Sequence, residues 1–386
     1  MDRVVIVGCN GGTDIALGGG AYLVTAMSKC LSEHGYEVHL VSTIGAEKEE
    51  LARIHGWELG DNVHTHYLIH FRSSVRLPYV AAIMALSRFR NLIRKLNPSF
   101  VIYNDDYPLS IANELRRDKV PRILYVHFPY LVRRRLGFDF MHNTTEWSLV
   151  ESVINYSIID RLFGDLHDLD FIFTNSQGTR NILINVESVD KGAISALYPP
   201  VKPVDTEVIN KGRPMFLHAA RQDKTFLSSE LYSFVDNMRR ALPNSIFLIN
   251  RNKDRRLYEL ADNKHVFVTQ WLSGDNWRRA LKLGKYYLHF KWFEGLGIAT
   301  VEAVLNGAVP IVYRSVFNGS WTDIARLCNE DCAFSTVDEA INNVLNLESD
   351  RRKFKALSQF LISELRGKFN YEAFCQSLIN IIKKYT

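Results

Sequence analysis

The feature that most constrains this chain is the stretch Leu288–Val312, which reads LHFKWFEGLGIATVEAVLNGAVPIV. It opens with an aromatic and apolar run that ends near Lys291, a composition that favours a β-strand. Gly295 and Gly297 follow, and two glycines so close together predict a tight loop. Any fold for this chain must therefore contain a strand that ends in a sharp turn.

The second half of the stretch predicts a helix and another strand. Ile298–Asn306 is expected to be a short helix, and Gly307 stands where helices favour a terminal glycine. Val309–Val312 then forms a second apolar strand. This order of elements is a βαβ unit of a parallel sheet, so we expect an α/β protein.

Two acids stand out in this mostly apolar segment. Glu294 lies in the loop and Glu302 in the helix, eight positions apart. An acid on a buried helix is costly unless it is paired or hydrogen-bonded, and a helix start binds anions through its N–H groups. The pattern predicts a diphosphate at the helix start, with sugar hydroxyls on the carboxylates. The alternative is a solvated loop acid and a salt-bridged helix acid.

Length and composition bound the rest of the chain. Its 386 residues suit two domains, and 47% hydrophobic with 23% charged residues is ordinary for a globular protein. Apolar runs are too short for a membrane span. The net charge of +5 fits an anionic ligand or a membrane surface, and we expect no nucleic-acid partner.

The cysteines and the opening residues indicate a reducing interior. The five cysteines are few, odd in number and scattered, so a disulfide framework is not expected. The first residues enter a strand directly and do not resemble a signal peptide. We therefore expect a cytoplasmic protein.

The amino-terminal segment predicts a second βαβ unit. Strand Arg3–Val7 leads into a loop with six glycines, and helix Ala21–Glu33 and strand Glu37–Ser42 follow. The glycines are not spaced as G-x-G-x-x-G, and the second strand is not followed by an acid for a ribose hydroxyl. Both features argue against the interpretation as an NAD-dependent oxidoreductase, which stays an open alternative.

Histidines and basic residues mark two further segments. His64, His66 and His70 alternate along one strand, but no carboxylate or cysteine joins them in the sequence, so a metal site is not expected.

Residues 71–96 are rich in arginine and predict an amphipathic basic helix. It is either a surface helix with one core face, or a contact for an anionic membrane or a lipid-linked acceptor. The run Arg133–Arg135 is a second basic cluster.

The Glu294–Val312 segment resembles the Glu-x7-Glu signature of retaining glycosyltransferases of family 4, which have the GT-B fold. The positions that match are Glu294, Gly295, Gly297, Glu302, Ala303, Gly307 and Pro310. The resemblance implies two Rossmann-like α/β domains that face a central cleft. It places an acceptor-binding domain at residues 1–200, completed by a C-terminal helix at 370–386, and a nucleotide-sugar-binding domain at 213–368.

Other motifs are similar to those of mannosyltransferases that extend dolichol-linked oligosaccharides. YVHFPYL, around His127, resembles their YVHYP element and implies that His127 lies near the anomeric carbon. Asn175–Thr179 resembles their N-S-x-x-T element, in which Ser176 would cap a helix. Phe317–Ile324 resembles a third element of these enzymes, with one glycine replaced.

The resemblance also implies a set of donor-binding residues. Arg221 and Lys224 would clamp the diphosphate, although Ala220 replaces the usual glycine and Lys224 is closer to Arg221 than usual. Glu294 would hold sugar hydroxyls and Glu302 the ribose. The helix-start residues Gly295, Gly297 and Ile298, and the amino-terminal glycines Gly19 and Gly20, complete the set.

The function implied is transfer of a hexosyl group with retention of configuration. The donor would be GDP-mannose or a UDP-sugar, and the acceptor a glycan or a lipid-linked molecule. Neither a metal nor a cofactor is required, and peripheral contact with the cytoplasmic face of a membrane is an option. A GT-B nucleotide-sugar epimerase and a non-catalytic nucleotide-sugar-binding protein remain as alternatives.

Overall fold

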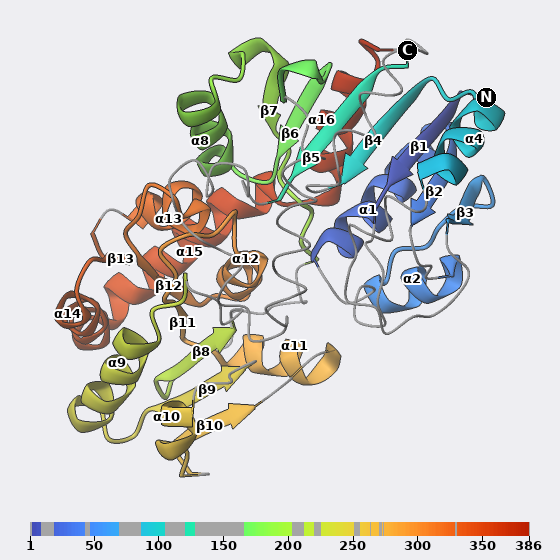
Figure 1. The fold of residues 1–386 in the computed structure, drawn as a ribbon. Coiled ribbons are helices and arrows are strands. Elements are labelled where there is room, and N and C mark those ends of the chain that lie inside the picture. Colours follow the sequence, from blue (N-terminus) through green and yellow to red (C-terminus); the bar gives the residue numbers. More distant parts are fainter. Residues whose placement is uncertain are drawn as a thin grey trace. The chain divides into compact units, whose positions relative to one another are not determined.

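The structure is a computed structural model in which the chain forms two compact units (Figure 1). The first unit comprises Met1–Asn175, Arg180–Pro200 and Tyr371–Thr386, and the second Ser176–Thr179 and Val201–Asn370. The residues that the structure describes are 2–8, 19–42, 47–68, 86–104, 120–127, 166–202, 212–219, 225–250, 255–262, 264–269, 272, 274–328 and 330–385.

The first unit is built on a parallel sheet with the strand order β3-β2-β1-β4-β5-β6-β7. Its strands are β1 (Arg3–Val7), β2 (Glu37–Ser42), β3 (Val63–Tyr67), β4 (Phe100–Asn104), β5 (Arg122–Val126), β6 (Phe171–Thr174) and β7 (Ile194–Ala196). Its helices are α1 (Gly19–Glu33), α2 (Lys48–His55), α4 (Leu86–Leu96), α8 (Gln177–Glu187) and α16 (Tyr371–Ile382), with short turns at Leu166–Asp168 and Lys191–Ala193.

The core of this unit forms because its central strands are mostly apolar. Every residue of β4 and β5 is buried, as expected for parallel strands covered on both faces. The buried face of α1 packs against the sheet and against α16, so the end of the chain joins the core begun by its first strand.

The second unit has a parallel sheet with the order β10-β9-β8-β11-β12-β13. Its strands are β8 (Met215–Ala219), β9 (Ile246–Asn250), β10 (Val266–Thr269), β11 (Tyr286–His289), β12 (Val309–Tyr313) and β13 (Ala333–Phe334). Its helices are α9 (Ser228–Ala241), α10 (Arg255–Glu259), α11 (Gly274–Leu283), α12 (Ile298–Leu305), α13 (Gly319–Asp323), α14 (Val337–Ser349) and α15 (Arg351–Lys368), with a turn at Ala325–Cys328.

The two parallel sheets confirm the predicted α/β class. The stretch Leu288–Val312 is the βαβ unit that the sequence predicts, with β11 and β12 adjacent and parallel. Gly297 has φ +72° and Gly307 has φ +84°, which accounts for glycine at both positions. The run Arg133–Arg135 and the amino-terminal part of the basic segment lie outside the described residues. Within the described ranges, no helix has the length and apolarity to cross a membrane.

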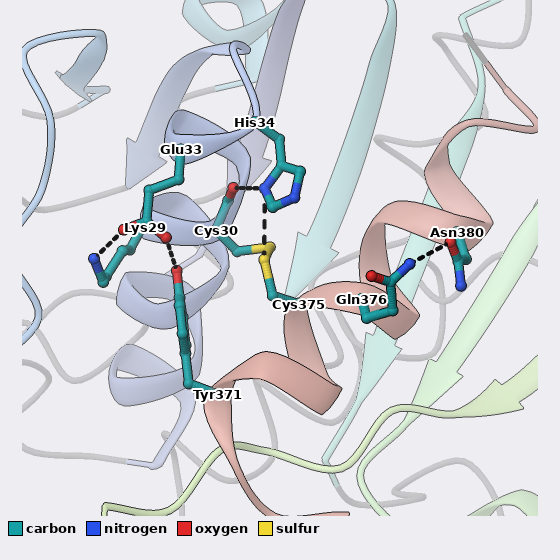
Figure 2. Close-up of a disulfide and its surroundings, with 8 residues drawn as sticks. All are labelled: Lys29, Cys30, Glu33, His34, Tyr371, Cys375, Gln376 and Asn380. Carbon is teal, nitrogen blue, oxygen red and sulfur yellow. Dashed lines mark hydrogen bonds and ion pairs between the residues drawn. A yellow bond between two sulfur atoms is a disulfide. The ribbon is translucent and has the colours of Figure 1, made fainter.

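The cysteines correct one expectation. Cys30 of α1 is bonded to Cys375 of α16, and Cys328 is bonded to Cys332. Figure 2 shows the first bond, beside which Tyr371 donates a hydrogen bond to Glu33 at 2.6 Å. The sequence analysis missed this pair of cysteines, 345 residues apart, because the predicted return of the C-terminal helix does not state which of its residues faces α1.

Opening the Cys30–Cys375 bond should destabilise the first unit. The substitution Cys375→Ala is expected to lower the free energy of unfolding by about 2–5 kcal/mol, because the bond closes a very long loop. Cys332→Ala is the matched control, since its bond spans only four residues and constrains the unfolded chain less. Thermal unfolding with and without dithiothreitol measures both effects, and an unchanged melting temperature of the wild type on reduction would contradict the prediction.

Candidate active site

The loop between β11 and α12 is fixed by the segment that begins α13. The Glu294 amide donates to the Phe317 carbonyl at 3.0 Å, and the Glu294 carbonyl accepts from the Gly319 amide at 2.9 Å. The Asn318 side chain caps α13 and donates to the Lys291 carbonyl at 2.7 Å. Because these bonds fix the backbone on both sides of Glu294, its side chain starts from a defined point.

The carbonyl of Gly295 accepts a hydrogen bond from the start of α8. Ser176–Thr179 belong to the second unit, although the rest of α8 belongs to the first. Ser176 Oγ donates to this carbonyl at 2.7 Å and also accepts from the Thr179 amide at 2.9 Å, so Ser176 is the helix cap that the sequence predicts. The Asp323 carboxylate accepts from the amides of residues 177 and 178 at 2.8 and 2.9 Å. The N-S-x-x-T segment therefore supports the glycine loop.

The start of α12 is open to a ligand. Gly297 occupies the cap position and makes no side-chain cap bond, and Ile298 and Ala299 are partly exposed. The next amide, of Thr300, already donates to the Gly297 carbonyl at 2.8 Å. No described side chain therefore caps the first N–H groups of the helix, an arrangement that suits an anion.

Each of the two signature acids has a partner that sequence reasoning missed. Lys291 Nζ lies 3.0 Å from Glu294 Oε2. The Trp277 indole N–H donates to Glu302 Oε2 at 3.2 Å, from α11 to α12. Lys291 could have been found from the sequence, because it lies three residues before Glu294 in the signature stretch. The contact between Trp277 and Glu302 could not, because these residues are 25 positions apart.

Two buried histidines lie beneath the loop. The His218 ring donates from Nδ1 to the Leu288 carbonyl at 2.9 Å, and His289 Nδ1 lies 3.4 Å from Thr300 Oγ1. Burial lowers the pKa of His218 to about 4 and the pKa of His289 to about 3. Both rings are therefore neutral near pH 7 and add no charge below the acids.

The predicted phosphate clamp, Arg221 and Lys224, lies outside the described residues, but both ends of its segment are fixed. The carbonyl of Ala219, the last residue of β8, accepts from the Tyr287 hydroxyl at 2.8 Å. The Thr225 carbonyl accepts from the Trp292 amide at 3.1 Å. Ala219 and Thr225, the described residues on either side of this segment, therefore contact β11 and the residue that follows Lys291.

In the first unit, His127 lies at the carboxyl end of β5 beside the start of α1. Its Nε2 is 2.8 Å from Asn104 Oδ1, so Nε2 carries the proton because a carboxamide oxygen only accepts. Asn104 also donates to the Gly20 carbonyl at 3.4 Å, and Asn175 donates to the His127 carbonyl at 2.7 Å. Gly19, which opens α1, is exposed. The structure thus brings His127 and Gly20 together, as members of one polar group.

The histidines of β3 are joined by a neighbouring strand. His66 Nε2 lies 2.9 Å from His39 Nδ1 of β2, and His64 Nε2 lies 3.6 Å from Glu37 Oε1. A carboxylate does therefore join this cluster, contrary to the sequence-based expectation. Burial lowers the pKa of His39 to about 4, so this ring is neutral at pH 7. His70 lies outside the described residues.

One group within the described ranges has the spacing of metal ligands. The ligand atoms of Cys30, His34 and Cys375 lie within 4.8 Å of one another. The two sulfur atoms are bonded to each other, which removes the thiolates that a metal would need. This group lies between α1 and α16 and does not belong to the glycine loop.

Comparison with known sequences identifies one family. Residues 17–204 match the model of a family described as Glycosyltransferase Family 4. No curated protein matches the chain in sequence. The matched region contains His127, Gly19 and Gly20, whereas the Glu-x7-Glu stretch lies beyond it.

Solved structures resemble the whole chain. Sucrose-phosphate synthase from Thermosynechococcus elongatus aligns with a TM-score of 0.73 and 13% identity, over 100% of this chain and 99% of that one. HepE from Anabaena, in complex with UDP-glucose, aligns with a TM-score of 0.69 and 11% identity over 100% of both chains. Trehalose 6-phosphate synthase from Burkholderia multivorans gives 0.67 and 12%, over 100% and 99%. At these identities the likeness shows the fold, GT-B, for the full chain.

Gly319 offers a test of how closely the loop is packed. A Cβ added there would lie 1.8 Å from the Gly295 carbonyl oxygen, so Gly319→Ala must displace the loop. We expect a loss of about 1–3 kcal/mol in the free energy of unfolding of the second unit. Gly367→Ala is the matched control, because a Cβ there meets nothing within 4 Å and alanine favours the helix. Urea unfolding compares the two variants, and equal stabilities would contradict this packing.

Proposed function

We propose that the chain, whose residues 17–204 match Glycosyltransferase Family 4, is a retaining hexosyltransferase with a nucleotide-sugar donor. The donor would be GDP-mannose, which the dolichol-type motifs favour, or a UDP-sugar. The acceptor would be a glycan or a lipid-linked molecule. The second unit would bind the donor and the first unit the acceptor.

The observation that carries this proposal is the loop before α12. It places an acid, Glu294, which is paired with Lys291, next to a helix start that has no side-chain cap. The Glu294 side chain keeps 24% of its surface exposed, so a ligand can reach it. A helix start suits a phosphate and a fixed carboxylate suits sugar hydroxyls, and a nucleotide sugar carries both groups.

The chemistry requires that the leaving diphosphate be stabilised as it gains negative charge. Preplaced donors do this best because they need no reorganisation during the reaction. In our proposal the N–H groups at Gly297 and Ile298 supply part of this stabilisation, and Arg221 and Lys224 supply the rest. Glu302, held by Trp277, would accept from the ribose hydroxyls. The proposal assigns no role to a metal.

The first unit would complete the donor site with His127 and the glycines of α1. The bond between His127 Nε2 and Asn104 fixes the imidazole ring, and the exposed start of α1 lets a ligand approach Gly19 and Gly20. We propose that His127 lies beside the anomeric carbon of the bound donor and contacts its sugar.

The donor can be found by a thermal-shift panel with UDP, GDP, ADP, NAD and NADP, and with the sugar conjugates of the nucleoside diphosphates. A ligand that binds only the folded state raises the melting temperature by mass action. We expect a rise with one nucleoside diphosphate and its sugar conjugate. A rise with only NAD or NADP would replace the proposal by an oxidoreductase.

Replacing the loop acid should abolish transfer. Glu294→Gln keeps the shape of the side chain but removes the charge, and we expect at least about a hundredfold loss of kcat for release of the nucleoside diphosphate. Arg221→Ala should cause a similar loss. Glu364→Gln, on the exposed face of α15, is the matched control and should retain full activity. A Glu294→Gln variant with wild-type turnover would refute the site assignment.

The basic face of α4 supports a lipid-linked acceptor. Its apolar residues Phe89, Ile93 and Leu96 are buried in the first unit. Its outer face exposes four cations, Arg88, Arg90, Arg94 and Lys95, and the helix contains no acid. This cationic face would contact an anionic surface mainly by charge, each residue adding about 1 kcal/mol.

This contact can be tested by sedimentation with vesicles of equal parts phosphatidylcholine and phosphatidylglycerol. We expect binding at low ionic strength that is lost at high salt, because exposed charges are screened. Arg94→Gln with Lys95→Gln should weaken it severalfold. Arg351→Gln with Arg352→Gln removes the same charge from exposed positions of α15 and is the matched control. Equal binding by the two double variants would eliminate α4 as the contact.

A further inference from the structure

A buried lysine accompanies the loop acid. The Lys291 side chain is only 3% exposed, and its Nζ lies 3.0 Å from Glu294 Oε2. Its backbone is held on both sides: its carbonyl accepts from Asn318, and Lys291 forms a β-bridge with Phe226. An ammonium that deep is costly to bury unless it is paired, so the position of Lys291 depends on the acid.

Both oxygens of the Glu294 carboxylate are engaged. Oε2 accepts from Lys291, and Oε1 lies 3.2 Å from the amide of Gly295 and accepts from it. An ionised carboxylate offers about four acceptor positions, so this arrangement leaves others for a ligand. The two bonds come from one side chain and one backbone group that are themselves fixed, and they hold the carboxylate plane in one orientation.

We propose that Lys291 is a positioning residue for Glu294, which keeps the carboxylate ionised and oriented toward the hydroxyls of the donor sugar. This inference rests on the proposed function. The same ammonium offsets the repulsion between Glu294 and the diphosphate that the helix start would bind. Without this ammonium, the carboxylate would repel the doubly charged leaving group more strongly.

Among the titratable groups described near Lys291, we expect a substitution at Lys291 to change the protonation of Glu294 and not that of the histidines. His289 of β11 and His218 of β8 approach Lys291 from the sheet below the loop. Burial keeps the pKa of His289 at about 3 and the pKa of His218 at about 4, so neither ring gains a proton above pH 6. The segment of Arg221, Asp223 and Lys224 carries further charges, which the variants below leave unchanged.

The chain offers a matched control for this pair. Lys285, directly before β11, is also buried, and its Nζ lies 2.7 Å from Glu348 Oε1. Its side chain is 8% exposed, and Glu348 lies in α14, away from the glycine loop. Lys291→Met and Lys285→Met thus each remove one buried ammonium near the same strand while keeping the side-chain volume. Only the first removes it from the proposed site.

The test is the pH profile of turnover between pH 4.5 and pH 9, read as UDP release from UDP-glucose or GDP release from GDP-mannose. In Lys291→Met, Glu294 loses a favourable charge and should take up its proton at a higher pH. The acidic limb of kcat should therefore move upward by about 1–3 pH units relative to the wild type. Lys285→Met should lower the melting temperature but keep the wild-type profile.

A double variant separates positioning from folding. The Glu294→Gln variant has no carboxylate charge for Lys291 to orient. Adding Lys291→Met to it should therefore change the residual turnover less than twofold. A Lys291→Met profile equal to that of the wild type, or an equal loss in both backgrounds, would overturn the inference. Absence of turnover by the wild type with either donor would instead refute the proposed function, and with it this role.

Discussion

The second unit depends on the close approach of two backbone segments at Gly295 and Gly319. The distance is so short that only glycine fits at Gly319, because a Cβ would lie 1.8 Å from the Gly295 oxygen. This contact lets Ser176 bond the same carbonyl and lets the Glu294 backbone bond both Phe317 and Gly319. The loop before α12 is therefore a rigid feature of the fold, and it sets where the acid and the helix start meet.

Rigidity matters here because the loop collects charges that would be costly if they could move. Lys291 is buried and Glu294 is partly buried, and the attraction between their charges offsets the cost of removing each from water. The neutral histidines below them add no competing charge. A site of this kind is already organised before the ligand arrives, and preorganisation is the main way in which proteins stabilise charge that develops in a transition state.

Much of this could be predicted from the sequence, because the signals were local. Glycines with positive φ, apolar strands and a serine cap each depend on a few neighbouring residues, and the βαβ unit at Leu288–Val312 formed as expected. The bond between Cys30 and Cys375 was expected to be absent, because the predicted return of the C-terminal helix does not state which of its residues faces α1. Trp277 and the carboxylate beside His64 were missed for the same reason: both contacts cross between elements whose packing the sequence does not state.

The central claim is that this chain transfers a hexosyl group with retention, and the anomeric configuration of the product tests it most directly. Proton NMR can follow the sugar that the enzyme releases from UDP-glucose or GDP-mannose, both α-linked donors, before mutarotation mixes the anomers. The account predicts that the α-anomer forms first and that Glu294→Gln forms it at least about a hundredfold more slowly. Initial release of the β-anomer would show inversion and contradict the assignment.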